Sequence, residues 1–208
     1  MIDQLLLLNW WVATGTLLLE IAVALKLISL IILTFTPGLS LRKLINEVSE
    51  NILKKFNFDV LSEKFLLVCI FLFSLSGTVL SLVYSEYFGQ VPCALCWFQR
   101  IFMYGIVVLS GLPLLASPYK IEEQNKLAQQ KYQLRNVLVF SILGAGFALY
   151  QHAEQILALY GTSLPCPVSG ADCAKMTIFE YGHITFPWLA FVFFTFFIIT
   201  ILLQRKLK

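Results

Sequence analysis

Charged residues are scarce in this chain. They make up 13% of its 208 residues, whereas soluble globular domains carry about 25%. Hydrophobic residues make up 59%, and the mean hydropathy is +0.81. The chain also lacks internal repeats and low-complexity tracts. This composition argues against an ordinary soluble domain and favours a single domain that lies mostly in lipid.

The N-terminus lacks the features of a removable secretory signal. Residues 1–3 contain no basic side chain, and no small-residue cleavage site closes the first apolar run. We therefore expect this run to be retained as part of the folded protein.

Apolar residues are gathered into five runs, each about as long as the roughly 20 residues that a helix needs to cross a bilayer. The runs cover about residues 5–36, 65–85, 98–117, 136–157 and 184–204. The connections between them are too short to fold alone, since independent folding is difficult below about 40 residues. The predicted fold is all-α, a polytopic membrane protein with a four-helix transmembrane bundle and one additional N-terminal transmembrane helix.

Helical spacing of apolar residues over 41–60 predicts an amphipathic helix on the membrane surface. The expected organisation is therefore an N-terminal unit, 1–64, with a transmembrane helix and this surface helix. The four-helix domain, 65–208, follows with two loops on the outer side. Residues 118–135 are expected to form a plain polar loop.

Positive charge is distributed unevenly along the chain. Of its 15 Lys and Arg residues, 12 lie in 42–64, 120–135 and 205–208, which share one side if every run crosses the membrane. Lys and Arg accumulate in cytoplasmic loops, so we expect an outer N-terminus and a cytoplasmic C-terminus in the cell membrane. Nucleic acid is not an expected partner, because these charges are spread over short connections.

Glu20 and Lys26 lie inside the first apolar run. Charged side chains at membrane depth are costly and are often functional. The alternative, which we favour, is that Glu20 faces other helices while Lys26 extends toward the cytoplasmic headgroups.

The two expected outer loops, 86–97 and 158–183, contain four of the five cysteines. Cys93 and Cys96 form a Cys-Ala-Leu-Cys motif just before the third apolar run. Helix N-termini stabilise thiolates, and low thiol pKa values are common with this spacing. Cys96 is closer to the expected helix start and is the better candidate for a reactive thiolate. Alone, this motif also fits metal binding or a structural link.

Cys166 and Cys173 lie in the second outer loop. They could form a structural disulfide, because disulfides persist on the oxidising side of a membrane. A four-thiolate zinc site with the first pair is formally available, but the wide spacing of this second pair disfavours it. No metal is expected. The fifth cysteine, Cys69, lies among apolar residues and is expected to be a small buried hydrophobe.

Arg100 follows Cys96 by four residues, so on a helix the two side chains lie on one side, one turn apart. A guanidinium there could donate hydrogen bonds to a quinone oxygen and stabilise its reduced anion. Binding of a lipid phosphate accounts for the spacing equally well.

Several motifs in order resemble the disulfide bond formation protein B (DsbB) family, in particular its short Gram-positive-type members. They are PCALCWFQRIFMY, with Cys93, Cys96 and Arg100, then YQHAEQ at 150–155, PCPVSGADC at 165–173 and YGHITFPWLAF at 181–191. The resemblance covers about residues 65–205. The N-terminal extension departs from the four spans usual in the family.

This resemblance implies a thiol:quinone oxidoreductase that reoxidises an extracytoplasmic DsbA-like thioredoxin-fold thiol oxidase. By position, Cys166 would form the mixed disulfide with that oxidase, and Cys173 would attack the first pair. Cys96 would then be the thiolate that faces the quinone, ubiquinone or menaquinone, beside Arg100.

Two further residues are candidates for the quinone site. Trp97 is placed to line the ring, although an interfacial aromatic belt also explains it. His152, together with Glu154, could relay protons to the quinone or could cap a helix at the interface.

Three other protein classes are less consistent with the sequence. An enzyme of the vitamin K epoxide reductase type usually carries the quinone-side CxxC near the end of the chain. A scaffold with two structural disulfides gives no reason for Arg100. A transporter would show paired Gly/Pro breaks at mid-membrane depth, and the runs lack them.

Overall fold

The fold is all-α in the computed structural model, which describes residues 2–35, 63–115, 123–162, 165–166 and 172–207. Five helices are long and apolar enough to cross a membrane. They are α1 (Ile2–Phe35), α3 (Glu63–Leu82), α4 (Ala94–Leu115), α5 (Glu123–Leu159) and α6 (Phe186–Leu207). A π-helical turn, η1 (Val83–Tyr87), continues α3. The predicted fold class, with one N-terminal helix and four packed helices, is confirmed.

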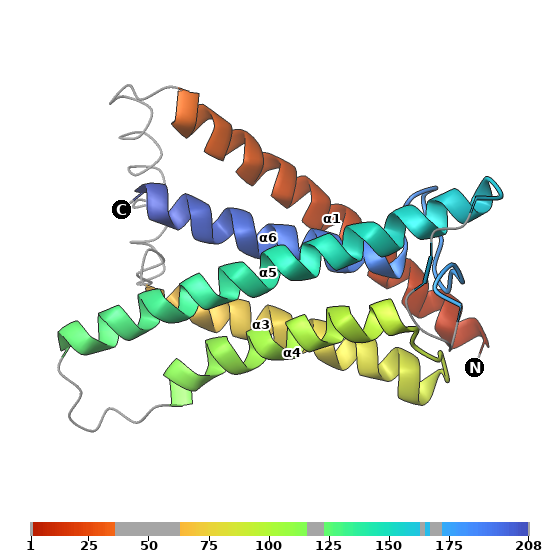
Figure 1. Ribbon diagram of the computed structural model, residues 1–208, viewed down its shortest axis with the longest axis horizontal. Helices are drawn as coiled ribbons and strands as arrows, with labels where there is room; N and C mark the ends of the chain where they lie inside the picture. Colours follow the sequence, from red (N-terminus) through yellow and green to blue (C-terminus); the bar gives the residue numbers. More distant parts are fainter. Residues whose placement is uncertain (1, 36–62, 116–122, 163–164, 167–171, 208) are drawn as a thin grey trace.

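The four helices α3, α4, α5 and α6 pack in chain order, each against the next, and α1 packs against α6 (Figure 1). In lipid, backbone polar groups must be satisfied within the segment, which is why long apolar runs form helices. The core of the bundle is centred on fully buried side chains from several helices, among them Leu67, Ile106, Phe194 and Phe197.

Close approach of α5 and α6 depends on Gly144. A Cβ atom at this position would lie 2.5 Å from Cζ of the buried Phe194 ring. Small residues at helix–helix contacts allow the two backbones to approach closely in membrane proteins. The contact fixes the lateral position of α5, whose last turns carry much of the site described below.

The predicted loop over 118–135 is wrong from residue 123 onward, because α5 begins at Glu123. The first turns of α5 contain Glu, Gln, Lys, Ala and Leu, which are strong helix formers. They are too polar to extend an apolar run, so hydropathy alone places the start of this helix too late in the sequence.

Helix α1 is anchored to the bundle by polar side chains. Asn9 accepts a 2.7 Å hydrogen bond from the hydroxyl of Tyr84. Glu20 accepts hydrogen bonds from Trp188 Nε1 at 2.5 Å and contacts His183 Nε2 at 3.4 Å. The expectation that Glu20 faces other helices is confirmed.

Lys26 differs from the expectation that it extends toward headgroups. Its Nζ donates a 2.7 Å hydrogen bond to Thr200 Oγ1 and lies 4.0 Å above the centre of the Phe196 ring. A hydroxyl and an aromatic face on α6 therefore hold the ammonium group within the helix pair.

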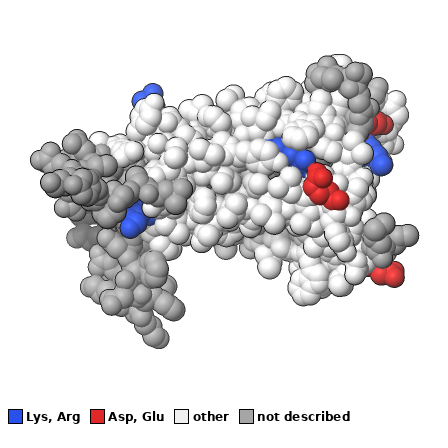
Figure 2. Space-filling model, turned by 90° about the horizontal axis from the view of Figure 1, so that it is seen from below, with Lys and Arg blue, Asp and Glu red and all other residues white. Residues whose placement is uncertain are grey.

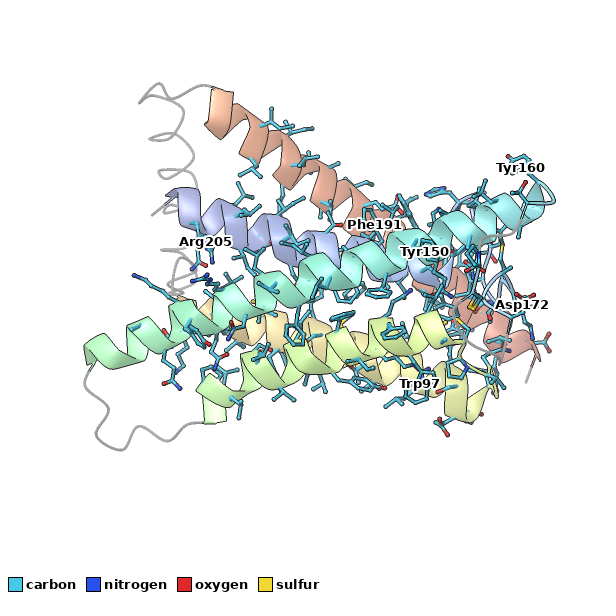
Figure 3. The ribbon with its side chains drawn as sticks, in the orientation of Figure 1. Trp97, Tyr150, Tyr160, Asp172, Phe191 and Arg205 are labelled. Atoms are coloured by element: carbon cyan, nitrogen blue, oxygen red, sulfur yellow. A yellow bond between two sulfur atoms is a disulfide. The ribbon has the colours of Figure 1, made fainter. Side chains whose placement is uncertain are left out.

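Charged side chains are sparse on the face of the molecule shown in Figure 2, where most of the described surface is uncharged. In Figure 3, Arg205 lies at one end of the bundle, whereas Tyr160 and Asp172 lie at the other. The exposed apolar flanks identify a multi-pass membrane protein. The amphipathic helix expected over 41–60 lies outside the described residues, and the boundary between 1–64 and 65–208 remains a prediction.

Candidate functional site

The first cysteine pair lies where the chain turns from η1 into α4. Gly89, with a φ of 66°, allows the turn, and Gln90 N–H donates to Tyr84 O at 3.0 Å. Helix α4 begins at Ala94, so Cys93 immediately precedes it and Cys96 lies in its first turn. The apolar run in the sequence predicts a helix that starts after both cysteines, at about residue 98. The structure starts the helix four residues earlier, at Ala94, so Cys96 belongs to the helix and not to the loop.

The sulfur atoms of Cys93 and Cys96 lie 2.9 Å apart as two free thiols. Cys96 N–H also donates to Cys93 Sγ at 3.4 Å. The hydrogen bond to Cys96, together with burial, raises the pKa of the Cys93 thiol above its ordinary value. Cys93 therefore retains its proton and donates it, which makes Cys96 the sulfur of this pair that can carry negative charge.

Gln151, on α5, holds both of these sulfurs. Its Nε2 lies 3.2 Å from Cys93 Sγ and 3.2 Å from Cys96 Sγ. Its Oε1 accepts a 2.8 Å hydrogen bond from Gln99 Nε2, so the amide cannot rotate freely. A fixed N–H donor beside a sulfur stabilises the thiolate form of that sulfur.

Cys166 and Cys173 form a disulfide, with their Cα atoms 6.2 Å apart. Cys173 is fully buried, whereas Cys166 is partly exposed. Gln155 Nε2, on α5, donates to Lys175 O at 3.1 Å and contacts Cys173 O at 3.5 Å. The end of α5 therefore holds this loop as well.

The two pairs belong to one cluster. Cys93, Leu95 and Cys173 form its buried part, and Cys96 and Cys166 pack against it together with Phe147. Pairs separated by some 70 residues in the chain thus share one apolar environment at one end of the bundle. In this state the disulfide leaves no four-thiolate zinc site.

A cavity of about 150 Å³ opens beside Cys96, between α3, α4 and α6. An apolar cavity of this volume is large enough to hold a benzene ring. Arg100 lines the cavity although it is only 8% exposed. Its Nε and Nη2 donate to Ser81 Oγ at 2.8 Å and to Ser81 O at 2.9 Å.

The surface of this cavity is mostly apolar, although several polar side chains line it. Thr78 Oγ1 is buried and has no hydrogen-bond partner among the described residues, and a buried hydroxyl without a partner is costly. Tyr84 also lines the cavity, and its hydroxyl is held by Asn9 of α1. An apolar cavity with a buried cation and an unsatisfied hydroxyl fits a ring that carries polar oxygens.

The structure brings together Cys93, Cys96, Cys166 and Cys173, and places Arg100 at the cavity beside Cys96. Two other predicted residues are not among those that line the cavity. Trp97 is 50% exposed, with the guanidinium carbon of Arg100 5.3 Å from its ring centre. His152 Nδ1 lies 3.0 Å from Thr185 Oγ1. The cavity gives neither residue support as a ligand of the ring.

Sequence reasoning missed the contributions of Gln99, Gln151, Thr78 and Ser81. The two glutamines could have been found, because both lie inside apolar runs. Polar side chains at such positions are costly and often functional. The motif at 150–155 contains Gln151, but the sequence alone favours its neighbour His152 as the candidate residue for the quinone site.

Comparison with known proteins identifies relatives of this chain. A family model described as "Disulfide bond formation protein DsbB" matches residues 63–204. The chain is similar to disulfide bond formation protein C of Bacillus subtilis (strain 168), with 34% identity over 128 residues, 62% of this chain and 83% of the relative. It is also similar to a probable disulfide formation protein of Metapseudomonas resinovorans, with 31% identity over 143 residues, 68% of this chain and 90% of the relative. No solved structure matches the chain.

The matched residues include both cysteine pairs and the four helices of the bundle, except for the last three residues of α6. Helix α1 precedes the matched region. Taken with the length of the match, this shows that the chain is a multi-pass membrane protein of the DsbB family, the disulfide bond formation proteins.

Proposed function

We propose that this protein is a thiol:quinone oxidoreductase that reoxidises an extracytoplasmic thioredoxin-fold thiol oxidase. Electrons would pass through Cys166–Cys173 and then through Cys93–Cys96 to a membrane quinone. The observation that carries the proposal is the position of Cys96, which belongs both to the buried sulfur cluster and to the wall of the cavity. A disulfide-forming oxidoreductase is what membership of the family implies.

The proposed orientation places both pairs on the outer side of the membrane. If every span crosses the membrane, most Lys and Arg residues would fall on the opposite side, as expected of the cytoplasmic side. The partner oxidase would therefore meet the loop that carries Cys166 and Cys173.

The exposure of the loop cysteines supports a direction for the exchange. Attack on Cys166 by a partner thiolate would form a mixed disulfide, break the Cys166–Cys173 bond and leave its electron pair on Cys173. Cys166 is the more accessible of the two sulfurs, whereas Cys173 is buried beside Cys93. When the first pair is a disulfide, Cys173 would attack Cys93 and release Cys96 as the thiolate.

The cavity supports a quinone as the final acceptor. A bound quinone would supply a lipid-soluble acceptor of two electrons and two protons. Arg100 would orient a ring oxygen and stabilise negative charge on it, because the two bonds to Ser81 use only part of its five N–H donors. Thr78 could supply a further hydrogen bond, and Gln151 would stabilise the Cys96 thiolate that faces the ring.

The first prediction concerns the partner. Cys173→Ser should accumulate a mixed disulfide through Cys166 when an oxidised thioredoxin-fold oxidase is added. The Cys166 thiolate opens the disulfide of the oxidase and releases one of its thiols, and Cys173, the thiol that would displace the oxidase from Cys166, is absent. Non-reducing electrophoresis and mass spectrometry of the linked peptides would identify the bond. Cys69→Ser, which removes a free thiol inside α3, is the control and should trap nothing. A bond through Cys93 instead would reverse the assigned order of the pairs.

The second prediction concerns Arg100. Lys keeps the charge but loses the planar guanidinium, and a charge-assisted hydrogen bond is worth about 1.5–3 kcal/mol. Since about 1.4 kcal/mol corresponds to a factor of ten, Arg100→Lys should weaken apparent quinone affinity by roughly one to two orders of magnitude. Steady-state kinetics with varied quinone would measure this, with thiol exchange between the loops preserved.

Arg135→Lys is the matched control, since Arg135 is exposed on α5 and does not line the cavity beside Cys96. Its quinone kinetics should equal those of the unmodified protein. Unchanged quinone kinetics in both Arg100→Lys and Arg100→Ala would contradict a role for Arg100 at the ring.

The third prediction concerns Gln151. Gln151→Leu keeps the approximate size of the side chain but removes the donor to Cys96, so the thiolate loses about 1.5–3 kcal/mol of stabilisation. Alkylation of Cys96 in the reduced protein at neutral pH should slow by about tenfold or more. Gln130→Leu, a change of another buried amide of α5 about 30 Å along the helix, should leave the rate unchanged. Equal rates in the two variants would refute the role of Gln151.

A further inference from the structure

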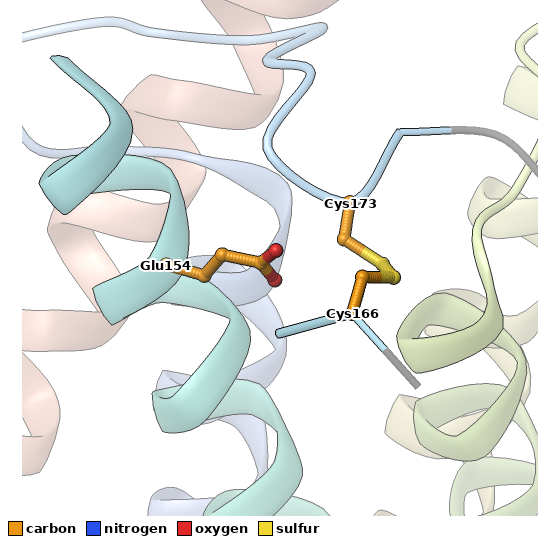
Figure 4. A group of neighbouring side chains, drawn as sticks. All are labelled: Glu154, Cys166 and Cys173. Carbon is orange, nitrogen blue, oxygen red and sulfur yellow. A yellow bond between two sulfur atoms is a disulfide. The ribbon is translucent and has the colours of Figure 1, made fainter. Parts of the chain in front are cut away.

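Glu154 is a buried acidic residue that the proposed electron path does not use. It lies on α5, three residues after Gln151, and is only 2% exposed. Figure 4 shows its carboxyl group pointing from the helix toward the Cys166–Cys173 disulfide. A carboxyl oxygen and the two sulfur atoms all lie within 4.8 Å of one another.

The surroundings of Glu154 favour a carboxyl group that carries its proton. Oε2 is buried and has no hydrogen-bond partner among the residues that the structure describes. Asp172, which immediately precedes Cys173, carries a charge of the same sign, and the side chain of Lys175 in this loop is exposed. Neither Gln155, which binds loop carbonyls, nor the disulfide supplies a positive charge. Burying an unpaired carboxylate is far more costly than burying the neutral acid.

A second cost arises at Cys173 during the exchange. When the disulfide opens at Cys166, the electron pair of the broken bond remains on Cys173, which is fully buried. A thiolate released in an apolar cluster without a cation or a proton donor is strongly destabilised. Glu154 is the acidic group that lies beside this sulfur.

We propose that Glu154 exchanges a proton with the sulfur of Cys173 each time the Cys166–Cys173 disulfide opens and closes. The assignment rests on the proposed function only in taking this pair as the one that reacts with the partner. It makes Glu154 a further catalytic residue of the loop disulfide, separate from the residues that line the cavity.

The opening step conserves atoms, electrons and charge. A thiolate of the attacking molecule forms a bond to Cys166 Sγ, the Cys166–Cys173 bond breaks, and the carboxyl proton of Glu154 moves to Cys173 Sγ. Glu154 is then a carboxylate and Cys173 a neutral thiol. When Cys173 next attacks a disulfide, the carboxylate takes back the proton and a thiolate leaves from that disulfide. Glu154 is unchanged over the cycle.

The test isolates the loop pair from the first pair and from quinone. The full-length protein with Cys93→Ala and Cys96→Ala would be held in lipid nanodiscs with its loop disulfide oxidised. Dithiothreitol would open this disulfide over a range of pH, and acid quenching with alkylation would give the rate. Because the first pair is absent, failure of quinone reduction in the intact protein would be a separate result.

The rate of disulfide opening is divided at each pH by the fraction of dithiothreitol that is thiolate, which is the form that attacks. This corrected rate should fall as pH rises, because Glu154 loses the proton that it donates. Glu154→Gln in the same background should be slower by about tenfold or more at low pH and should show no such fall, since general acid catalysis typically contributes about 10²–10⁴. Glu154→Asp should retain part of the pH dependence. Asp172→Asn, the control for loss of a nearby charge, should retain the rate at low pH and the fall, but the fall should move to lower pH because a charge of the same sign has been removed.

Infrared spectroscopy gives a readout that does not depend on the rate. The oxidised protein should show the carbonyl band of a buried protonated carboxylic acid, and Glu154→Gln should lack it while unfolding at a similar temperature. The proposal is overturned if the band persists in Glu154→Gln. It is also overturned if that variant keeps the pH dependence, or is slower at every pH by the same factor, as a purely structural role would predict.

Discussion

The last three turns of α5 contact both cysteine pairs, and the arrangement of the site depends on these contacts. Gln151 donates to the sulfurs of the first pair, and Gln155 binds the backbone that follows the second pair. Glu154 lies between them and faces the loop disulfide. Residues three and four apart lie on one face of a helix. One rigid element therefore fixes how the two sulfur pairs lie relative to each other.

The position of this helix end is set by the packing of the whole bundle. Gly144 allows α5 to approach Phe194 of α6, and α4 packs along the other side of α5. These contacts bring the first two turns of α4, with Cys96 and Arg100, to the edge of the cavity. Helix α1 lies outside the matched family region but contacts a residue of the cavity wall, because Asn9 accepts a hydrogen bond from the hydroxyl of Tyr84.

Hydropathy predicts the membrane spans, and cysteine spacing identifies the four loop cysteines as candidate site residues. Both signals can be read from a short stretch of sequence. The start of α5 was missed because its first turns are polar while still favouring a helix. Lys26 was placed near the headgroups because Thr200, its partner on α6, is more than 170 residues away in the chain. Gln151 cannot be identified from the sequence for the same reason, because the sulfur atoms that it contacts are distant in the chain and only the fold brings them beside it.

The proposed function requires that electrons from a partner thiol reach a quinone through both cysteine pairs. Single turnover without oxygen would measure this transfer, with the protein in nanodiscs that contain quinone and with a reduced thioredoxin-fold oxidase added. We expect one quinol for each partner disulfide formed, and none when Cys96 or Cys166 is replaced by Ser. Oxidation of the partner without quinol, or quinol formation in the Cys166→Ser variant, would contradict it.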